Sequence, residues 1–559
     1  MASLNYSPCQ SNSLSSATLI SLPVELLTSI LSYLPNRDVK NVRQTCTLLL
    51  GVARLRLSRV FLSANPRNIS VFRAIADHET FRKEVSEIVW DDARLVKYPV
   101  NHRNFYVEYN QSPELWDCKP AHNTGVPVWF MPICKNNMEE LRRRRGRDVD
   151  TPAHITRFRQ LGAQLSYPES WSYYQTLLKQ QEEILDTGAD IEAFKYGLQR
   201  FPALRRIVIT PAAHGWLYTP LYETPMIRGF PYGFNYPLPR GWPCTDEGDP
   251  TPRVYAWDDE EEKNKWRGFR LVTRELARQK HQISELLVDS HYLNTGLSCR
   301  IFDEPCDEYN DFVALLRTPG FRRLDLDLLV GGQEHRGWAS FRNGHLRHAL
   351  GEADLEHISL RTGVVPNPDA NALVRGSGGS MEHHIPLRSI FPTEKWPRLR
   401  HFGLSGFLVQ QADVLSLLAT LPATLRSVEL SFFYFLDHGG NYMSLLEDMR
   451  DTLGWRERPA HARPRVAVGV HLHQPRAGRA IWIGGEVDAF LYGGGRNPFG
   501  RDGWAKNQVS VGRGAVRDAF DPAHERPYVD FSSYMRLGYY SKSAWLDERR
   551  PPADCLEQL

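Results

Sequence analysis

The sequence predicts a mixed protein of the α+β or α/β class, in which a small N-terminal module of three helices precedes an irregular solenoid of alternating strands and helices. Two observations predict this fold. Apolar residues at helical spacing are concentrated in residues 20–64, and a short strand-like pattern then recurs with helical segments between its copies. The chain has 559 residues, of which 42% are hydrophobic, so it is long enough for two to four domains.

The first helix of the module is expected to begin after Ser21, a residue type suited to an N-cap. Pro23 then falls in the first turn, where its missing N–H costs nothing. One helical face carries Leu26, Leu27, Ile30, Leu31 and Leu34. Pro35 is expected to end this helix, because proline cannot continue it and restricts the residue before it.

A second helix, capped by Asn36 or Asp38, would place Val39, Val42 and Cys46 on one side, and a third apolar run covers residues 48–57. A unit of roughly 40 residues is near the lower size limit for folding alone. The module is therefore expected to dock, either on the rest of this chain as an ordinary helical hairpin or on another protein.

The spacing of these residues resembles the F-box. The matching positions are Leu22-Pro23, Glu25, Leu26-Leu27, Ile30-Leu31, Leu34-Pro35, Asp38-Val39, Arg43 and Cys46, whereas the tryptophan that the family often carries later is absent from residues 47–60. The resemblance implies docking on the Skp-type adaptor, and hence on the cullin scaffold, of an SCF-type ubiquitin ligase. It assigns this contact to Leu22, Pro23, Glu25, Leu26, Ile30, Leu31, Leu34, Val39, Val42 and Cys46. The remainder of the chain would bind a target protein.

A six-residue pattern, apolar-x-x-apolar-x-apolar, follows the module. Its copies have as middle residues Ile88, Ile207, Leu286, Leu324, Ile358, Phe402 and Val428, and helical-looking segments lie at 189–200, 262–280, 307–317, 339–350 and 411–420. Strand, loop and helix in that order predict a leucine-rich-repeat-like solenoid. The copies are unevenly spaced, against about 20–29 residues in regular repeats, so a non-repeat α/β domain with parallel strands is the alternative.

These patterns give a map of the whole chain. The predicted regions are a leader at 1–19, the F-box module at 20–64, a mostly helical linker at 65–200, the irregular array at 201–460, a β-rich cap at 461–540 and a tail at 541–559. Short strands are expected in the cap at 466–472, 480–483 and 487–492, because the end of a solenoid needs a different outer surface.

An aromatic insertion interrupts the array at 215–244, where 30 residues include eight aromatics and six prolines. It is either a stiff exposed recognition surface or a plug buried against the array. As a recognition surface it would bind the target through Trp216, Tyr218, Tyr222, Phe230, Tyr232, Phe234, Tyr236 and Trp242. With segments 72–82 and 87–95, it resembles a class of fungal F-box proteins, a resemblance that implies no particular target.

Composition excludes several other classes of protein. The formal charge is only +3, which argues against binding driven by nucleic-acid phosphates. Eight cysteines without a CxxC pair fit neither a disulfide scaffold nor a zinc module. The sequence has no apolar run of 18 residues and no basic residue before Arg37, so neither a membrane span nor a targeting peptide is expected. An intracellular location, cytoplasmic or nuclear, is predicted.

Candidate chemistry is sparse. Asp91-Asp92 are expected to cap a turn, residues 258–262 to open a helix, and Asp289-Ser290-His291 lacks the surroundings of a catalytic triad. His383-His384 and His471 with His473 lack further ligands, so no metal, cofactor or catalytic residue is predicted. The basic run 142–145 is either a contact for an acidic partner, a nuclear address or a solvated helix end.

We therefore expect a non-catalytic adaptor that recognises a target for a ubiquitin ligase. An interaction scaffold that uses the module for another assembly is the alternative, and an enzyme of hydrolase or metal-dependent type would need a converged polar pocket.

Overall fold

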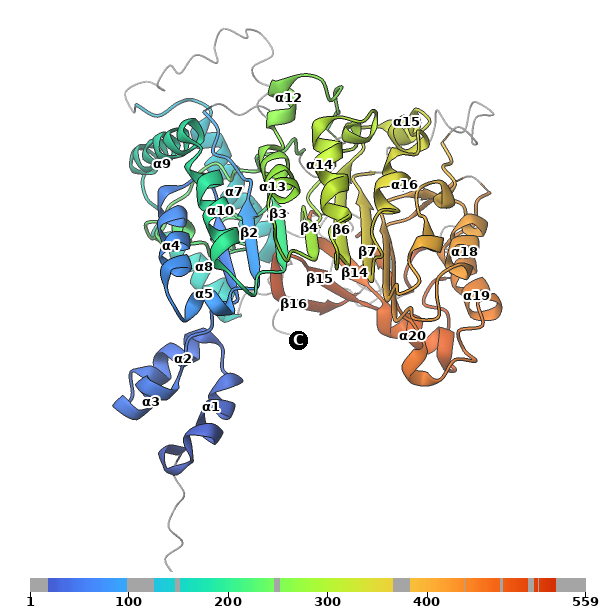
Figure 1. Cartoon of the computed structure of the whole chain (residues 1–559), viewed down its shortest axis with the longest axis horizontal. Helices are drawn as coiled ribbons and strands as arrows, with labels where there is room; N and C mark the ends of the chain where they lie inside the picture. The colour runs from blue at the N-terminus through green and yellow to red at the C-terminus, as the bar shows by residue number, and fades with distance from the viewer. Residues whose placement is uncertain are drawn as a thin grey trace, which may run out of the picture.

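A computed structural model describes residues 19–97, 125–145, 151–245, 252–364, 383–436, 438–472, 476–500, 507–510 and 512–528. Apart from Leu19, the predicted leader at 1–19 lies outside these residues, as does the predicted tail at 541–559. Three short helices, α1 (Val24–Ser32), α2 (Asn36–Arg43) and α3 (Thr47–Val52), form the N-terminal module. Figure 1 shows them projecting from the body that the rest of the described chain forms.

In the described part of the chain, ten strands form one sheet in which neighbouring strands are parallel. The main path is β1 (Arg59–Leu62), β2 (Glu87–Asp91), β3 (Arg206–Thr210), β4 (Glu285–Val288), β6 (Arg323–Leu329), β7 (His357–Thr362), β8 (His401–Ser405), β10 (Ser427–Ser431) and β12 (Arg465–Ala467), with β5 (Leu297–Ser298) beside β6. The order of the strands on this path follows their order along the chain. The parallel sheet confirms the α/β class, whereas the leucine-rich-repeat-like solenoid stays a prediction.

Helices connect successive strands. They are α4 (Pro66–Asp77), α5 (Phe81–Glu84), α7 (Phe130–Arg145), α8 (Pro152–Gly162), α9 (Tyr167–Thr187), α10 (Ala189–Arg200), α11 (Pro225–Arg228), α12 (Glu260–Asn264), α13 (Arg267–Arg278), α14 (Asp307–Leu316), α15 (Ala339–Arg342), α16 (His345–Leu350), α18 (Gln411–Ala419) and α19 (Tyr442–Thr452). The helices expected at 189–200, 307–317 and 411–420 correspond to α10, α14 and α18. No helix among the described residues combines the length and the apolar character that crossing a membrane requires.

The main core lies between the sheet and the helices that pack on one of its faces. The second residue of each strand points into it, as Ile88, Ile207 and Leu286 do, and these residues align as partners across the sheet. Helix side chains such as Phe194 and Phe269 complete the core. Because side chains alternate along a strand, the first, third and fifth residues point to the other face of the sheet.

The sheet begins earlier than the sequence predicts. Residues 65–200 were expected to be a mostly helical linker, and residues 20–64 to belong to the module alone. In the structure β1 starts at Arg59 and pairs with β2, which pairs with β3 beyond the supposed linker. The segment around Ile88 that carries the apolar pattern is therefore strand β2 of the sheet. The helices between β2 and β3 are an insertion between two adjacent strands.

Smaller sheets follow the parallel sheet. In the described C-terminal part, β13 (Gly469–Val470), β14 (Arg479–Trp482), β15 (Ala515–Asp518) and β16 (Asp521–Pro527) form an antiparallel sheet, and β9 (Leu408–Val409) pairs with β11 (Tyr434–Phe435). The strand expected at 487–492 is wrong, because Gly484–Tyr492 forms helix α20. Its apolar side chains Val487, Phe490 and Leu491 follow helical, not strand, spacing and are buried together.

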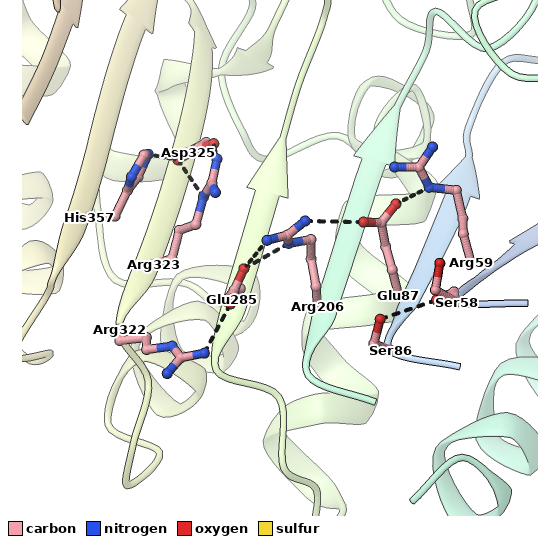
Figure 2. Close-up of polar contacts among 10 residues, drawn as sticks. All are labelled: Ser58, Arg59, Ser86, Glu87, Arg206, Glu285, Arg322, Arg323, Asp325 and His357. Carbon is pink, nitrogen blue, oxygen red and sulfur yellow. Dashed lines mark hydrogen bonds and ion pairs between the residues drawn. The ribbon is translucent and has the colours of Figure 1, made fainter. Parts of the chain in front are cut away.

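A ladder of charged side chains crosses the start of the strands, on the face opposite the helices (Figure 2). Arg59 of β1 and Arg206 of β3 both bond Glu87 of β2, and Arg206 also donates to Glu285 of β4 at 2.7 Å. Arg322, just before β6, donates to the second oxygen of Glu285 at 3.2 Å. Opposite charges thus alternate across neighbouring strands, which favours this register over a shifted one.

Replacement of Glu285 by alanine is expected to lower the free energy of unfolding by about 1.5–3 kcal/mol, because two arginines lose a shared, nearly buried acceptor. Denaturant unfolding of the full chain measures this. Arg322→Ala serves as the control, since that side chain is 45% exposed and its loss should cost less than about 1 kcal/mol. Equal losses in the two variants would contradict the role assigned to Glu285.

Candidate protein-interaction sites

The module has a small core of its own. Leu27 and Leu31 of α1, Val39 of α2 and Leu49 of α3 are buried against one another with Ala53. Arginine side chains tie the helix ends together: Arg43 donates to the carbonyl of Ala53, and Arg56 donates to the carbonyls of Ser32 and Leu34 after α1. These three carbonyls at helix ends are therefore satisfied within the module.

The same module leaves large apolar side chains exposed. On α1 and the turn before it, Leu26 is 52% exposed, Ile30 43%, Val24 52% and Ile20 55%. On α3, Leu48 and Leu50 are 42% and 47% exposed, and Tyr33 at the end of α1 is 86% exposed. Leu26 and Ile30, four residues apart, share one face of α1, and exposed apolar side chains on a small projecting unit are typical of a surface for another protein.

The residues predicted to dock divide into two groups. Pro23, Glu25, Leu26, Ile30 and Cys46 are exposed. Leu31 and Val39, by contrast, are buried in the core of the module, and Leu22, Leu34 and Val42 pack against that core. Leu31 and Val39 therefore support the fold of the module, whereas Leu22, Leu34 and Val42 are half-buried, and the assignment of these residues to adaptor docking stays a prediction.

Sequence reasoning also missed contributors to this surface. Val24, Leu48 and Leu50 were not assigned to docking, although they lie in the same apolar runs. The available signal was the number of apolar residues in these helices, which exceeds what two or three short helices can bury against one another.

The start of α1 also differs from the prediction. Pro23, not Ser21, occupies the N-cap position of α1, because Leu19–Ser21 forms a separate 3-10 turn.

The aromatic insertion at 215–244 packs mainly inward. Phe234 and Tyr236 are 2% and 5% exposed, and their rings stack with centroids 4.6 Å apart. With Phe230 they contribute to a second core that also contains Tyr174 of α9 and Phe130 of α7. The alternative of a buried plug therefore describes this part of the segment, and Phe234 and Tyr236 are corrected from target-binding to core residues.

Other aromatics of the insertion are placed differently. Tyr232 is 58% exposed, whereas Tyr218 and Tyr222 are half-buried. Trp216 is half-buried and Trp242 is buried, yet both line a large cavity.

This cavity has a volume of about 1230 Å³. It lies where β2, β4, β7, β8 and β10 end, and α7 and the antiparallel strands β14 and β15 contribute the opposite wall. Ring contacts join the two sheets beside it: Trp482 of β14 lies 6.2 Å from Phe432 and 6.3 Å from Tyr292, measured between ring centroids.

An ion pair joins α7 to β15 at the edge of the cavity. Arg144 donates to Asp518 at 3.0 Å, and Arg479 of β14 donates to the same carboxylate oxygen at 2.8 Å. Burial alone would raise the pKa of Asp518, but the charges of Arg144 and Arg479 lower it below its ordinary value. The basic run at 142–145 is thus not simply a solvated helix end, because Arg144 is buried in this pair.

Asp91, the last residue of β2, is a buried acid that lies next to the buried side chain of His214. Asp91 Oδ1 accepts the amide N–H of Ala93 at 3.0 Å, as expected for a turn cap, while its Oδ2 lies 3.9 Å from His214 Nε2. Burial raises the pKa of Asp91 to about 8 and lowers the pKa of His214 to about 3. His214 Nδ1 shares a hydrogen bond of 2.7 Å with the hydroxyl of Tyr236.

Asp91→Asn is expected to remove a pH dependence of stability. Between about pH 4 and 8 the folded state keeps a proton on Asp91 that the unfolded state releases, so this group lowers stability as pH rises. His214 has the opposite effect: between about pH 3 and 6.5 the unfolded state binds a proton that the folded state does not, so this group raises stability as pH rises. From pH 6.5 to 8 the melting temperature of the variant should therefore rise relative to wild type by about 1–2 °C. Parallel melting curves would contradict this.

The polar residues that the sequence analysis considered and set aside as candidate chemistry lie in separate contacts. Ser290 Oγ donates to Asp327 at 2.7 Å, whereas His291 Nε2 lies 3.2 Å from Asp289, so no Ser–His pair forms there. Asp259 caps α12, as expected for an acidic helix start. In the described ranges, no three His, Cys, Asp or Glu side chains are grouped as a metal would require, and His473 lies outside those ranges.

Comparison with known proteins supports the assignment of the module. Residues 19–57 match the F-box-like family model, which covers α1, α2 and α3. No curated protein matches the chain significantly.

Proposed function

We propose that this chain, which carries an F-box-like domain at residues 19–57, is the substrate-recognition subunit of an SCF-type ubiquitin ligase. The observation that carries the proposal is the exposed apolar surface of α1 and α3 on a module whose own core is already closed. The family match gives this surface a partner, since F-box domains generally bind Skp-type adaptors.

The energetics of the surface fit a docking role. Leu26 and Ile30 are about half exposed, and each large aliphatic side chain that becomes buried contributes on the order of 1.5–3 kcal/mol. Neither side chain belongs to the core of the module. Its fold therefore does not require them, and a partner can cover them without rearranging the helices.

In this proposal the body of the chain binds the target protein. The partner subunits carry out ubiquitin transfer, so this chain acts by holding a target near the reacting groups. Strands that follow the chain order, each parallel to the one before, support a degenerate leucine-rich-repeat-like array as the scaffold for target binding.

The test is co-purification of the full chain with a Skp-type adaptor, followed by addition of the cullin. A stoichiometric complex that recruits the cullin is the expected result. Binding of the adaptor without the cullin would instead indicate an interaction scaffold outside the ligase. A folded chain that does not bind the adaptor would overturn the proposal.

A further inference from the structure

We propose that the edge of the parallel sheet at which the strands begin is a docking surface for a short acidic segment of a partner protein. The surface consists of the six residues that precede each of β1, β2, β3, β4 and β6, and we call it the basic edge. The inference goes beyond the proposed function, because it assigns a second interaction surface outside the apolar face of α1 and α3.

The net charge of the basic edge is the first argument. Its 30 residues include nine lysines or arginines and one carboxylate, that of Glu84. By contrast, the six residues that follow each of the same five strands include three cations and three carboxylates in total. Since the formal charge of the whole chain is only +3, positive charge is concentrated at one end of these strands, where it attracts anionic groups of a partner.

Unpaired cations are the second argument. Four of the nine are already engaged, because three pair with carboxylates and Arg56 donates to carbonyls of the module. With the residues that the structure describes, five cations form neither an ion pair nor a side-chain hydrogen bond: Arg54, Arg82, Lys83, Arg205 and Lys280. Arg82 is half-buried and the other four are exposed. Their charge is therefore accessible to a partner.

The charged ladder beside the basic edge does not neutralise it. The two carboxylates of the ladder that lie nearest, Glu87 and Glu285, are each shared by two arginines. Three arginines, Arg59, Arg206 and Arg322, thus use these two carboxylates (Figure 2). The cation excess of the basic edge persists after these pairs are counted.

Backbone pairing arranges the basic edge as a row, which is the third argument. The amide of Ser86 donates to the carbonyl of Ser58 at 2.9 Å, and that of Arg205 donates to Ser86 at 3.1 Å. The row continues from Arg205 to Ser284 and from Ser284 to Arg322, each at 2.9 Å. Neighbouring strands lie about 4.8 Å apart, so five strands span about 19 Å, the length of about six residues of extended chain. The row therefore suits a short extended segment.

The side chains that the basic edge lacks favour an acidic segment over other anionic partners. Among the described residues, the exposed large apolar side chains all lie outside this edge. Folded partner proteins bind mainly through aromatic and apolar anchors, and single-stranded nucleic acids stack their bases on exposed aromatic rings. Carboxylates pair with guanidinium and ammonium groups without such anchors.

The position of the basic edge also indicates a protein partner. Strand β1 begins seven residues after α3 ends, and Figure 1 shows the module projecting from this side of the body. A protein assembled on the module would therefore lie next to the basic edge.

Binding of fluorescently labelled octaglutamate to the full chain tests the proposal, with octaglutamine as the uncharged probe. Fluorescence anisotropy at low ionic strength, where surface charges are least screened, should give a Kd at least 10-fold lower for octaglutamate. The Lys83→Gln, Arg205→Gln, Lys280→Gln variant removes three exposed, unpaired cations of the basic edge. Its Kd for octaglutamate should rise about 10-fold, because each exposed charge pair contributes modestly and three are lost.

The matched control is the Lys135→Gln, Lys179→Gln, Arg253→Gln variant, which lowers the net charge equally. These side chains are also exposed and form no ion pair with the described residues, but they lie on α7, on α9 and before α12. The Kd for octaglutamate should change less than 2-fold, and melting temperatures show that both variants are folded. Equal Kd values for the two probes, or equal losses in the two variants, would overturn the inference.

Single-stranded octathymidylate is the third probe, and we expect it to bind more weakly than octaglutamate. Tighter binding of octathymidylate that is lost in the variant of the basic edge would assign this surface to nucleic acid and would also overturn the inference.

The outcome is separable from that of the proposed function, because octaglutamate binding is measured without the adaptor. Normal adaptor binding without preference for octaglutamate would refute the inference about the basic edge alone. Octaglutamate binding by a folded chain that does not bind the adaptor would refute the ligase proposal alone.

Discussion

Placing aspartate at both Leu26 and Ile30 is expected to weaken binding of a Skp-type adaptor by at least 100-fold. The two side chains are exposed neighbours on one face of α1. Loss of their burial removes about 3–6 kcal/mol, and every 1.4 kcal/mol is tenfold in Kd. Two carboxylates would also be desolvated at the interface. Titration calorimetry with purified adaptor gives Kd, and the melting temperature should remain that of wild type.

Thr28→Asp, Ser32→Asp provides the matched control for this variant. These residues have the same spacing on α1, are exposed, and use their hydroxyls only toward carbonyls of their own helix. The added charge is identical but falls on another side of the helix, so Kd should change by less than about 3-fold. If both double variants bound equally well, the apolar face of α1 would not be the docking surface.

Asp518→Ala is expected to produce the largest loss of stability, about 3–5 kcal/mol. The Asp518 side chain is 2% exposed and accepts bonds from Arg144 and Arg479, which are themselves nearly buried. Removal of the carboxylate leaves both arginines without this counter-charge. Denaturant unfolding measures the loss, and hydrogen exchange should show faster opening of β14 and β15 than of the parallel strands.

A neighbouring pair that joins β15 to β16 serves as the comparison for Asp518. Arg517 bonds Glu525 where both side chains are more than half exposed, so Arg517→Ala should cost less than about 1 kcal/mol. The stabilisation from Asp518 should also be lost in acid. Because the pKa of Asp518 is lowered in the folded state, its full contribution is present above the ordinary aspartate pKa and disappears as pH falls through the lowered pKa. Comparable losses in the two variants would show that burial does not decide the effect.

Local periodicity in the sequence was sufficient for much of the fold. Strands around Ile207, Leu324 and Val428 were predicted, because a buried strand and the helix after it each leave a short-range pattern. The same pattern around Ile88 was present, but the long helical insertion before β3 hid that this strand belongs to the same sheet. Because β2 and β3 are far apart in the sequence, the prediction placed the start of the sheet too late in the chain.

The sites were harder to predict than the fold. Periodicity shows that Ile30 and Leu31 are both in an apolar stripe, but only the packing of three helices decides that Leu31 enters the core and Ile30 does not. The cavity has no local signature, because Arg94, Trp216 and Trp482 meet there from distant parts of the chain.

The contact between Arg144 and Asp518 also has a consequence for how the protein is made. These residues are 374 positions apart, so a ribosome adding about 5–20 residues per second needs roughly 20–75 s to supply the second after the first. Throughout that interval α7 is present without its acidic partner, and the wall formed by β14 and β15 is incomplete. A nascent chain can thus complete α1, α2 and α3 well before β14 and β15 complete the wall of the cavity.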